Sequence, residues 1–166
     1  EENVLRLDDR VCDYIPAFSH GGKHRITLRH VLSHRAGVPN LPPEAIDLDL
    51  LSRPDEVVRL LSESELVSRP GRVLAYHAVT GGFILAEVVR RATGLDMRQV
   101  LEEKISRPLG LKWLSFGVSP QDVGAVAQNA FTGLPVVPPM KQLLQRALGV
   151  TMREAVDLSN DPRFIT

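Results

Sequence analysis

The sequence has very little cysteine, few aromatic residues, no excess charge of either sign and no long hydrophobic run. Its single cysteine, Cys12, excludes an internal disulfide and any site built from several thiolates. Lys+Arg 20 cancels Asp+Glu 20, which argues against a nucleic-acid binder, because such proteins usually carry a basic face. No apolar run approaches the ~18 residues that a membrane helix needs, so we expect no membrane span.

What is present is typical of a folded chain with a real core: 166 residues, of which 43% are hydrophobic and 24% charged. We expect a single helical domain over residues 1–166. The chain opens with the acidic phrase Glu1-Glu2-Asn3, without a methionine and with no apolar stretch behind it. This opening is unlike a signal peptide, and we expect the chain to be a fragment of a larger protein.

Glycine and proline, 12 of each, divide the chain into short helices and loops. The clearest pattern runs over residues 78–92, where apolar side chains cover most of the helix girth and Gly94 follows as a stop. Helices are further predicted over 27–34, from 54 with Ser52 as its cap, over 96–106, from 119, over 139–148 and from 151. Strands are expected only as short, isolated pieces at 73–75 and 114–118. The predicted fold is mainly α and loop-rich.

Two serine-hydrolase motifs are missing. Gly-x-Ser-x-Gly does not occur, and neither does Ser-x-x-Lys, which sets a serine one helical turn from the amine that can take its proton. The residues three before the four lysines are His20, Leu101, Leu109 and Pro138. No Gly-Lys-Ser/Thr phosphate loop occurs either, and we expect no cofactor.

Histidine is concentrated in one place, because four of the five lie within residues 20–34. His30 and His34 are four residues apart, so on one helix their rings would share a face and could hold a metal. The glutamate usual in such a zinc motif is missing, and no third ligand lies nearby. We therefore expect no metal site, and hydrogen-bonded or surface histidines are the favoured interpretation. A small metal protein is kept as an alternative.

Four phrases, taken in order, carry a family resemblance. They are Leu7-Asp8-Asp9-Arg10-Val11 with Tyr14-Ile15-Pro16, the run ITLRHVLSHRAGVP over residues 26–39, Pro70-Gly71 with Tyr76 five residues after the glycine, and ISRPLGL over residues 105–111. The chain resembles the serine β-lactamase-related hydrolases: class C β-lactamases, DD-peptidases and family VIII-type esterases. The resemblance implies the helical region of a β-lactamase/transpeptidase-like fold, lacking most of the β-sheet.

The resemblance implies two site residues. Tyr76 corresponds to the catalytic tyrosine of the family's second motif, the alternative being a packed core tyrosine. His77 would line the substrate pocket, the alternative being a loop histidine. The family usually has asparagine two residues after this tyrosine, where this chain has Ala78, which disfavours β-lactam hydrolysis and favours the esterase branch. His20-Gly21-Gly22 precedes Tyr76, so we reject it as the family's third motif.

The function implied is esterase-like acyl hydrolysis of a small-molecule ester or amide, with this chain supplying the tyrosine of the second motif. The serine and lysine of the Ser-x-x-Lys motif are absent, so we expect the chain alone to be inactive. Apolar surface that would meet the missing sheet is expected to be exposed and to favour self-association. The alternative function is a non-catalytic binding or scaffolding module derived from the same family.

Overall fold

The computed structural model describes residues 4–41, 48–77, 79–133, 137–142 and 151–166. The chain divides into two compact units, Glu1–Phe116 and Gly117–Thr166. We call them unit 1 and unit 2 and describe each by itself. The single helical domain expected over residues 1–166 stays a prediction.

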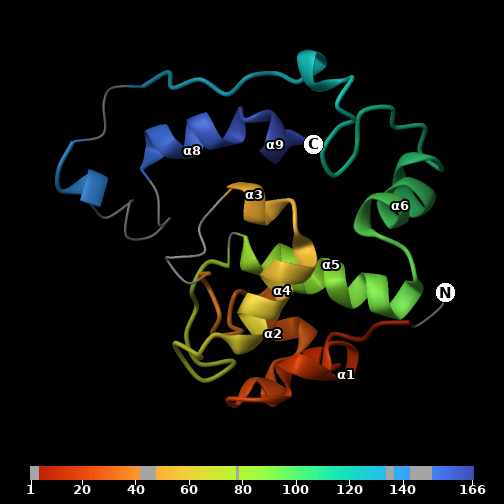
Figure 1. Ribbon diagram of the computed structural model, residues 1–166, viewed down its shortest axis with the longest axis vertical. Coiled ribbons are helices and arrows are strands. Elements are labelled where there is room, and N and C mark those ends of the chain that lie inside the picture. The colour runs from red at the N-terminus through yellow and green to blue at the C-terminus, as the bar shows by residue number, and fades with distance from the viewer. Residues whose placement is uncertain (1–3, 42–47, 78, 134–136, 143–150) are drawn as a thin grey trace. The chain divides into compact units, whose positions relative to one another are not determined.

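Unit 1 is built from short helices (Figure 1). They are α1 (Val11–Tyr14), the 3-10 helices η1 (Pro16–Ser19) and η2 (Lys23–Arg25), α2 (Leu28–Leu32), α3 (Leu48–Leu51), α4 (Pro54–Glu63), α5 (Thr80–Thr93), α6 (Met97–Leu101) and the π-helical turn η4 (Glu102–Ser106). Within the described residues the only β pairing is an isolated antiparallel bridge between Arg10 and Thr27. The mainly helical prediction is confirmed, whereas the short strands predicted at 73–75 and 114–118 are wrong.

Unit 2 contains η5 (Val123–Ala125), α8 (Met152–Ser159) and α9 (Pro162–Ile165). The segment around Asn129 is tied to the end of α8, because Asn129 N–H donates to Asn160 Oδ1 and Asn160 Nδ2 donates to the Asn129 carbonyl, both at 2.8 Å. The helix predicted from 151 is confirmed, and the one predicted from 119 is a turn followed by η5. Most of the predicted helix 139–148 lies outside the described residues.

Capping residues explain where several helices begin and end. Thr27 accepts from the His30 backbone N–H at the start of α2, and Asp96 accepts from the Gln99 N–H at the start of α6. The predicted cap at Ser52 is wrong: its hydroxyl donates to the Asp49 carbonyl instead, although α4 does begin at Pro54. α5 ends at Gly94, which takes the left-handed conformation (φ 76°), as predicted.

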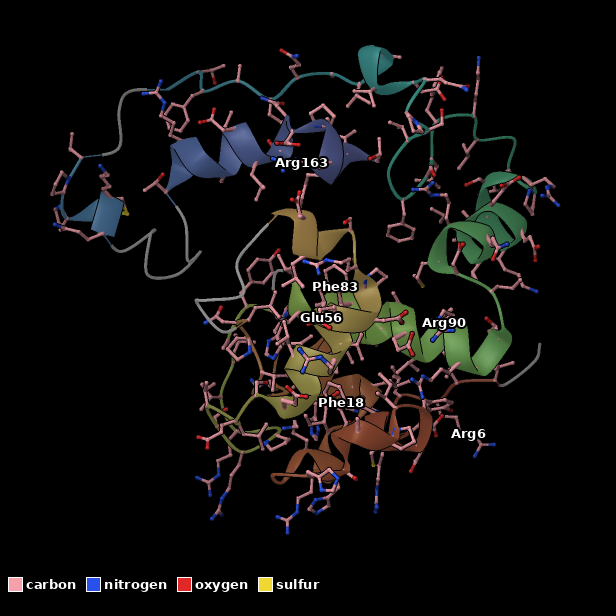
Figure 2. The ribbon with its side chains drawn as sticks, viewed as in Figure 1. Arg6, Phe18, Glu56, Phe83, Arg90 and Arg163 are labelled. Carbon is pink, nitrogen blue, oxygen red and sulfur yellow. The ribbon has the colours of Figure 1, made fainter. Side chains whose placement is uncertain are left out.

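The core of unit 1 gathers around α5, which contacts α1, α2, α4 and α6. The largest fully buried side chains include Phe18 of η1, Ile84 and Val88 of α5, and Leu61 of α4, and Phe18 lies where η1 meets α4 (Figure 2). Each such side chain contributes about 1.5–3 kcal/mol by leaving water. This core fixes the position of α5, whose first turn carries one side of the candidate site.

One charged group of α5 is also buried. Glu87 is 7% exposed and binds Arg90 at 2.7 Å and Arg91 at 2.5 Å. Burial opposes ionisation of Glu87, but the hydrogen bonds from the two arginines outweigh it, and the pKa of this carboxyl is lowered. No helix in the described part of the chain is long and apolar enough to cross a membrane.

Candidate functional site

Two segments about 40 residues apart in sequence come together around Tyr76. The first is the turn after α2, residues 34–38, and the second is the segment 75–77 that leads into α5. The Ala75 N–H donates to the His34 carbonyl at 2.9 Å, and the His77 N–H donates to His34 Nδ1 at 3.2 Å. We call these two segments the Tyr76 site.

The turn depends on an unusual backbone conformation at His34. Helix α2 ends at Leu32, and His34 has φ 57° in the left-handed region, which costs a non-glycine residue about 1–2 kcal/mol. Three residues later Gly37 has φ 83°. An ideal Cβ on Gly37 would overlap the Ser68 carbonyl oxygen. The turn therefore also needs glycine at this position, because only a residue without a side chain lets the backbone at Ser68 approach so closely.

His77 anchors the second segment. Its side chain is 2% exposed, its Nε2 accepts the Val38 N–H at 3.3 Å, and its Nδ1 lies 2.5 Å from the Ala75 carbonyl oxygen. A carbonyl can only accept, so the ring carries its hydrogen on Nδ1 and is neutral. Burial lowers the pKa of His77, a bond to the Ala75 carbonyl opposes that effect, and the neighbouring His34 adds to it. Both ring nitrogens bind backbone here, and the predicted contact of His77 with substrate stays a prediction.

Tyr76 lies between these two anchored residues. Its side chain is 60% exposed, which argues against the alternative of a packed core tyrosine. Its ring meets the ring of His34 edge-on, with centroids 4.9 Å apart and planes at 65°. The structure therefore holds the backbone of Tyr76 on both sides while leaving its phenol open to solvent. Its predicted catalytic role stays a prediction.

The N-terminus of α5 is docked onto the same turn. The Thr80 hydroxyl donates to the Val38 carbonyl at 2.8 Å. A Cβ on Gly81 would lie 3.3 Å from the His77 Cβ and 3.7 Å from Val31 Cγ1, so the glycine allows a close approach. These contacts connect the Tyr76 site to the core helix.

The paired histidines do not form the metal clamp that their spacing allows. α2 ends at Leu32, so His30 and His34 do not share a helical face. His30 Nδ1 accepts the Thr27 N–H at 3.2 Å, while His34 Nδ1 accepts the His77 N–H. Among the residues that the structure describes, no group of three or more His, Cys, Asp or Glu side chains could hold a metal ion.

His34 is the residue of this site that sequence reasoning misplaced. The pattern placed it within a helix over residues 27–34, but it lies beyond the end of α2 and contacts both Tyr76 and His77. A signal was available, because histidine is one of the few non-glycine residues enriched in the left-handed region, and Gly37 already marked a turn.

A cavity of about 940 Å³ in unit 1 lies elsewhere, lined by parts of η1, η2, α4 and α5, and residues 34–38 and 75–77 are not among its lining. Lys23 lines it with a side chain that is 2% exposed and donates from Nζ to the Ser64 carbonyl at 2.6 Å. Burial lowers the pKa of this amine. Ion pairs in the cavity wall join Glu87 to Arg91 and Glu63 to Arg59.

Comparison with known proteins gives a consistent answer. The family model described as Beta-lactamase matches residues 1–151. The Esterase/beta-lactamase LipL of Mycobacterium tuberculosis is 39% identical over 125 residues, 74% of this chain and 28% of that protein. The structure of EstA from Arthrobacter nitroguajacolicus Rue61a matches with a TM-score of 0.75 and 28% identity, covering 98% of this chain and 44% of EstA. The crystal structure of a family VIII carboxylesterase matches with a TM-score of 0.71 and 32% identity, covering 76% of this chain and 35% of that one.

Other relatives carry the names of D-alanyl-D-alanine carboxypeptidases and penicillin-binding proteins. The chain spans between 28% and 44% of the length of the three proteins described above. The predicted fold, the helical region of a β-lactamase-type fold, is confirmed by these matches and by the absence of strands among the described residues. The chain belongs to the beta-lactamase family.

Proposed function

We propose that this chain forms part of the active site of a serine hydrolase with esterase-like activity, in which Tyr76 transfers protons and the serine and lysine lie outside these 166 residues. The observation that supports this most is the placement of Tyr76, whose phenol is exposed while the N–H groups of Ala75 and His77 are bonded to His34. The relatives named as esterases support the reaction class.

The proposed chemistry follows the order of acyl transfer. The serine hydroxyl attacks the ester carbonyl as Tyr76 accepts its proton, and the resulting oxyanion is stabilised by backbone N–H groups. The proton then passes to the departing alkoxide, which leaves an acyl-enzyme. Water attacks that acyl-enzyme, its proton goes to the same tyrosine and then to the serine oxygen, and the acid is released.

A positive charge is needed for this role. A free phenol titrates near ~10, so it accepts a proton at neutral pH only where a neighbouring cation favours the phenolate. In the proposed site that cation is the motif lysine. None of the four lysines of this chain has a serine three residues before it, so the catalytic centre is completed from outside this chain.

The preference for esters over β-lactams is tested by substrate comparison. In a form of the protein that carries the serine and lysine, we expect nitrophenyl butyrate to be hydrolysed and nitrocefin to react about two- to tenfold more slowly. The reason is that alanine at position 78 cannot make a hydrogen bond to the lactam amide, a bond worth ~0.5–1.5 kcal/mol. Ala78→Asn should narrow the gap between the two substrates. Equal rates on both substrates would contradict the ester preference, and no hydrolysis of either would favour the scaffolding alternative.

The exposed apolar side chains that are close in sequence to the two segments of the Tyr76 site lead to a second prediction. Leu32, Val73, Leu74 and Val79 are exposed, Leu74 by 65%. We expect the 166-residue chain to bind an environment-sensitive dye such as anilinonaphthalene sulfonate and to self-associate in sedimentation experiments. Leu74→Glu, which leaves the core untouched, should weaken both effects. A dye-negative monomer would contradict an uncovered apolar surface at this site.

A further inference from the structure

His34 contacts Tyr76, the residue proposed as catalytic, and the residues on either side of it. Its carbonyl accepts the Ala75 N–H at 2.9 Å, its Nδ1 accepts the His77 N–H at 3.2 Å, and its ring lies edge-on to the Tyr76 ring at 4.9 Å. The first two bonds hold the backbone N–H groups of the residues before and after Tyr76, and the third contact limits where the phenol can turn. One residue therefore contacts Tyr76 and both of its neighbours.

The left-handed backbone of His34 makes this possible. At φ 57° the chain reverses just after α2, so the side chain and the carbonyl of the same residue both reach the segment 75–77. Glycine or asparagine adopts that conformation at less cost. Neither, however, supplies an aromatic ring, and glycine has no acceptor for the His77 amide.

The hydrogen bonds also fix the hydrogens on the two rings. His34 Nδ1 accepts from the His77 amide, so the hydrogen of the neutral His34 ring lies on Nε2. The His77 ring carries its hydrogen on the other nitrogen: its Nδ1 donates to the Ala75 carbonyl and its Nε2 accepts from the Val38 N–H. The ring centroids are 6.0 Å apart, with planes at 30°. The two histidines therefore hold complementary tautomers, joined through the His77 amide.

We propose that His34 is a positioning residue for Tyr76, which it holds through the backbone N–H groups of Ala75 and His77 and through its ring. The effect of His34 on catalysis rests on the proposed function of Tyr76, whereas its contacts with residues 75–77 do not. His34 carries out no proton transfer in this account. It fixes the backbone and restricts the ring of the residue that does.

The test is nuclear magnetic resonance on the 166-residue chain labelled with ¹⁵N. At neutral pH the imidazole nitrogens should show His34 as the Nε2–H tautomer and His77 as the Nδ1–H tautomer. Asparagine in His34→Asn can adopt the left-handed backbone conformation and offers a side-chain oxygen as acceptor for the His77 amide. Glycine in His34→Gly can adopt that conformation but has no side-chain acceptor. We expect the His77 amide to stay protected from hydrogen exchange in His34→Asn and to exchange at least about tenfold faster in His34→Gly. Both variants should lose the ring-current shift on the Tyr76 ring protons.

Unchanged exchange of the His77 amide in His34→Gly, or unchanged Tyr76 ring shifts in both variants, would overturn the proposal. A spectrum that shows His34 and His77 in the same tautomer would also overturn the proposal. In a form that carries the nucleophile, His34→Gly should lower kcat for nitrophenyl butyrate with little change in KM, and His34→Asn should restore part of it. Because the resonance data need no turnover, failure of the proposed function and failure of this inference give different results.

Discussion

Replacing Tyr76 by phenylalanine is expected to lower kcat for aryl-ester hydrolysis by about 10²- to 10⁴-fold, the usual contribution of a positioned acid–base group. The assay is nitrophenyl butyrate hydrolysis by a form of the protein that carries the proposed serine and lysine. The phenol is 60% exposed and its ring is kept in the variant, so the loss should come from the hydroxyl and not from the fold. Thermal unfolding of the variant should match that of the wild type.

Tyr14 provides the matched control, because it is the other tyrosine of the chain. Its hydroxyl donates to Asp9 Oδ2 at 2.8 Å and is remote in sequence from the Tyr76 site. Tyr14→Phe should cost about 0.5–1.5 kcal/mol of stability and leave kcat unchanged. A Tyr76→Phe enzyme that keeps its rate, or a Tyr14→Phe enzyme that loses as much, would show that Tyr76 is not the proton-transfer residue.

Gly37→Ala is expected to destabilise unit 1 by about 2–5 kcal/mol. A left-handed backbone accounts for about 1–2 kcal/mol of this, and the overlap of a new Cβ with the Ser68 carbonyl oxygen, which only a backbone shift can relieve, accounts for about 1–3 kcal/mol. The shift would also disturb the neighbouring Val38 N–H that His77 accepts. Chemical denaturation of the 166-residue chain measures the loss.

Two other glycines separate these causes. Gly94 has φ 76° with open space around its Cβ position, so Gly94→Ala should lose only about 1–2 kcal/mol. Gly82 lies within α5, also has open space and has no positive φ, so Gly82→Ala should gain about 0.5–1 kcal/mol from helix propensity. If Gly37→Ala costs no more than Gly94→Ala, the close approach to Ser68 does not matter for stability.

Local features of the fold were predictable because their causes are local. The apolar pattern over residues 78–92, with Gly94 after it, predicts a helix that the structure places at Thr80–Thr93. Capping by Thr27 follows from its hydroxyl and its position before the apolar residues of α2. In these cases the residues that determine the structure are neighbours in the chain, so a pattern is enough.

The arrangement of the candidate site was not predictable in the same way. Tyr76 was found through a resemblance of phrases, but its contacts depend on His34, 42 residues earlier. The left-handed turn at His34 is strained and persists because contacts with the segment 75–77 hold it. The residue types hint at a turn there, but they do not reveal those distant contacts. The burial of Lys23 is similar, since its acceptor is the distant Ser64 carbonyl.

We propose that this chain holds a prepared tyrosine but not the nucleophile that uses it. The most direct measurement is nitrophenyl butyrate hydrolysis by the folded 166-residue chain beside its Tyr76→Phe variant, with circular dichroism to show that both are helical. We expect rates equal to the buffer background for both proteins. Turnover by the wild-type chain that Tyr76→Phe abolishes would contradict this proposal, because the chain would then contain a complete catalytic site.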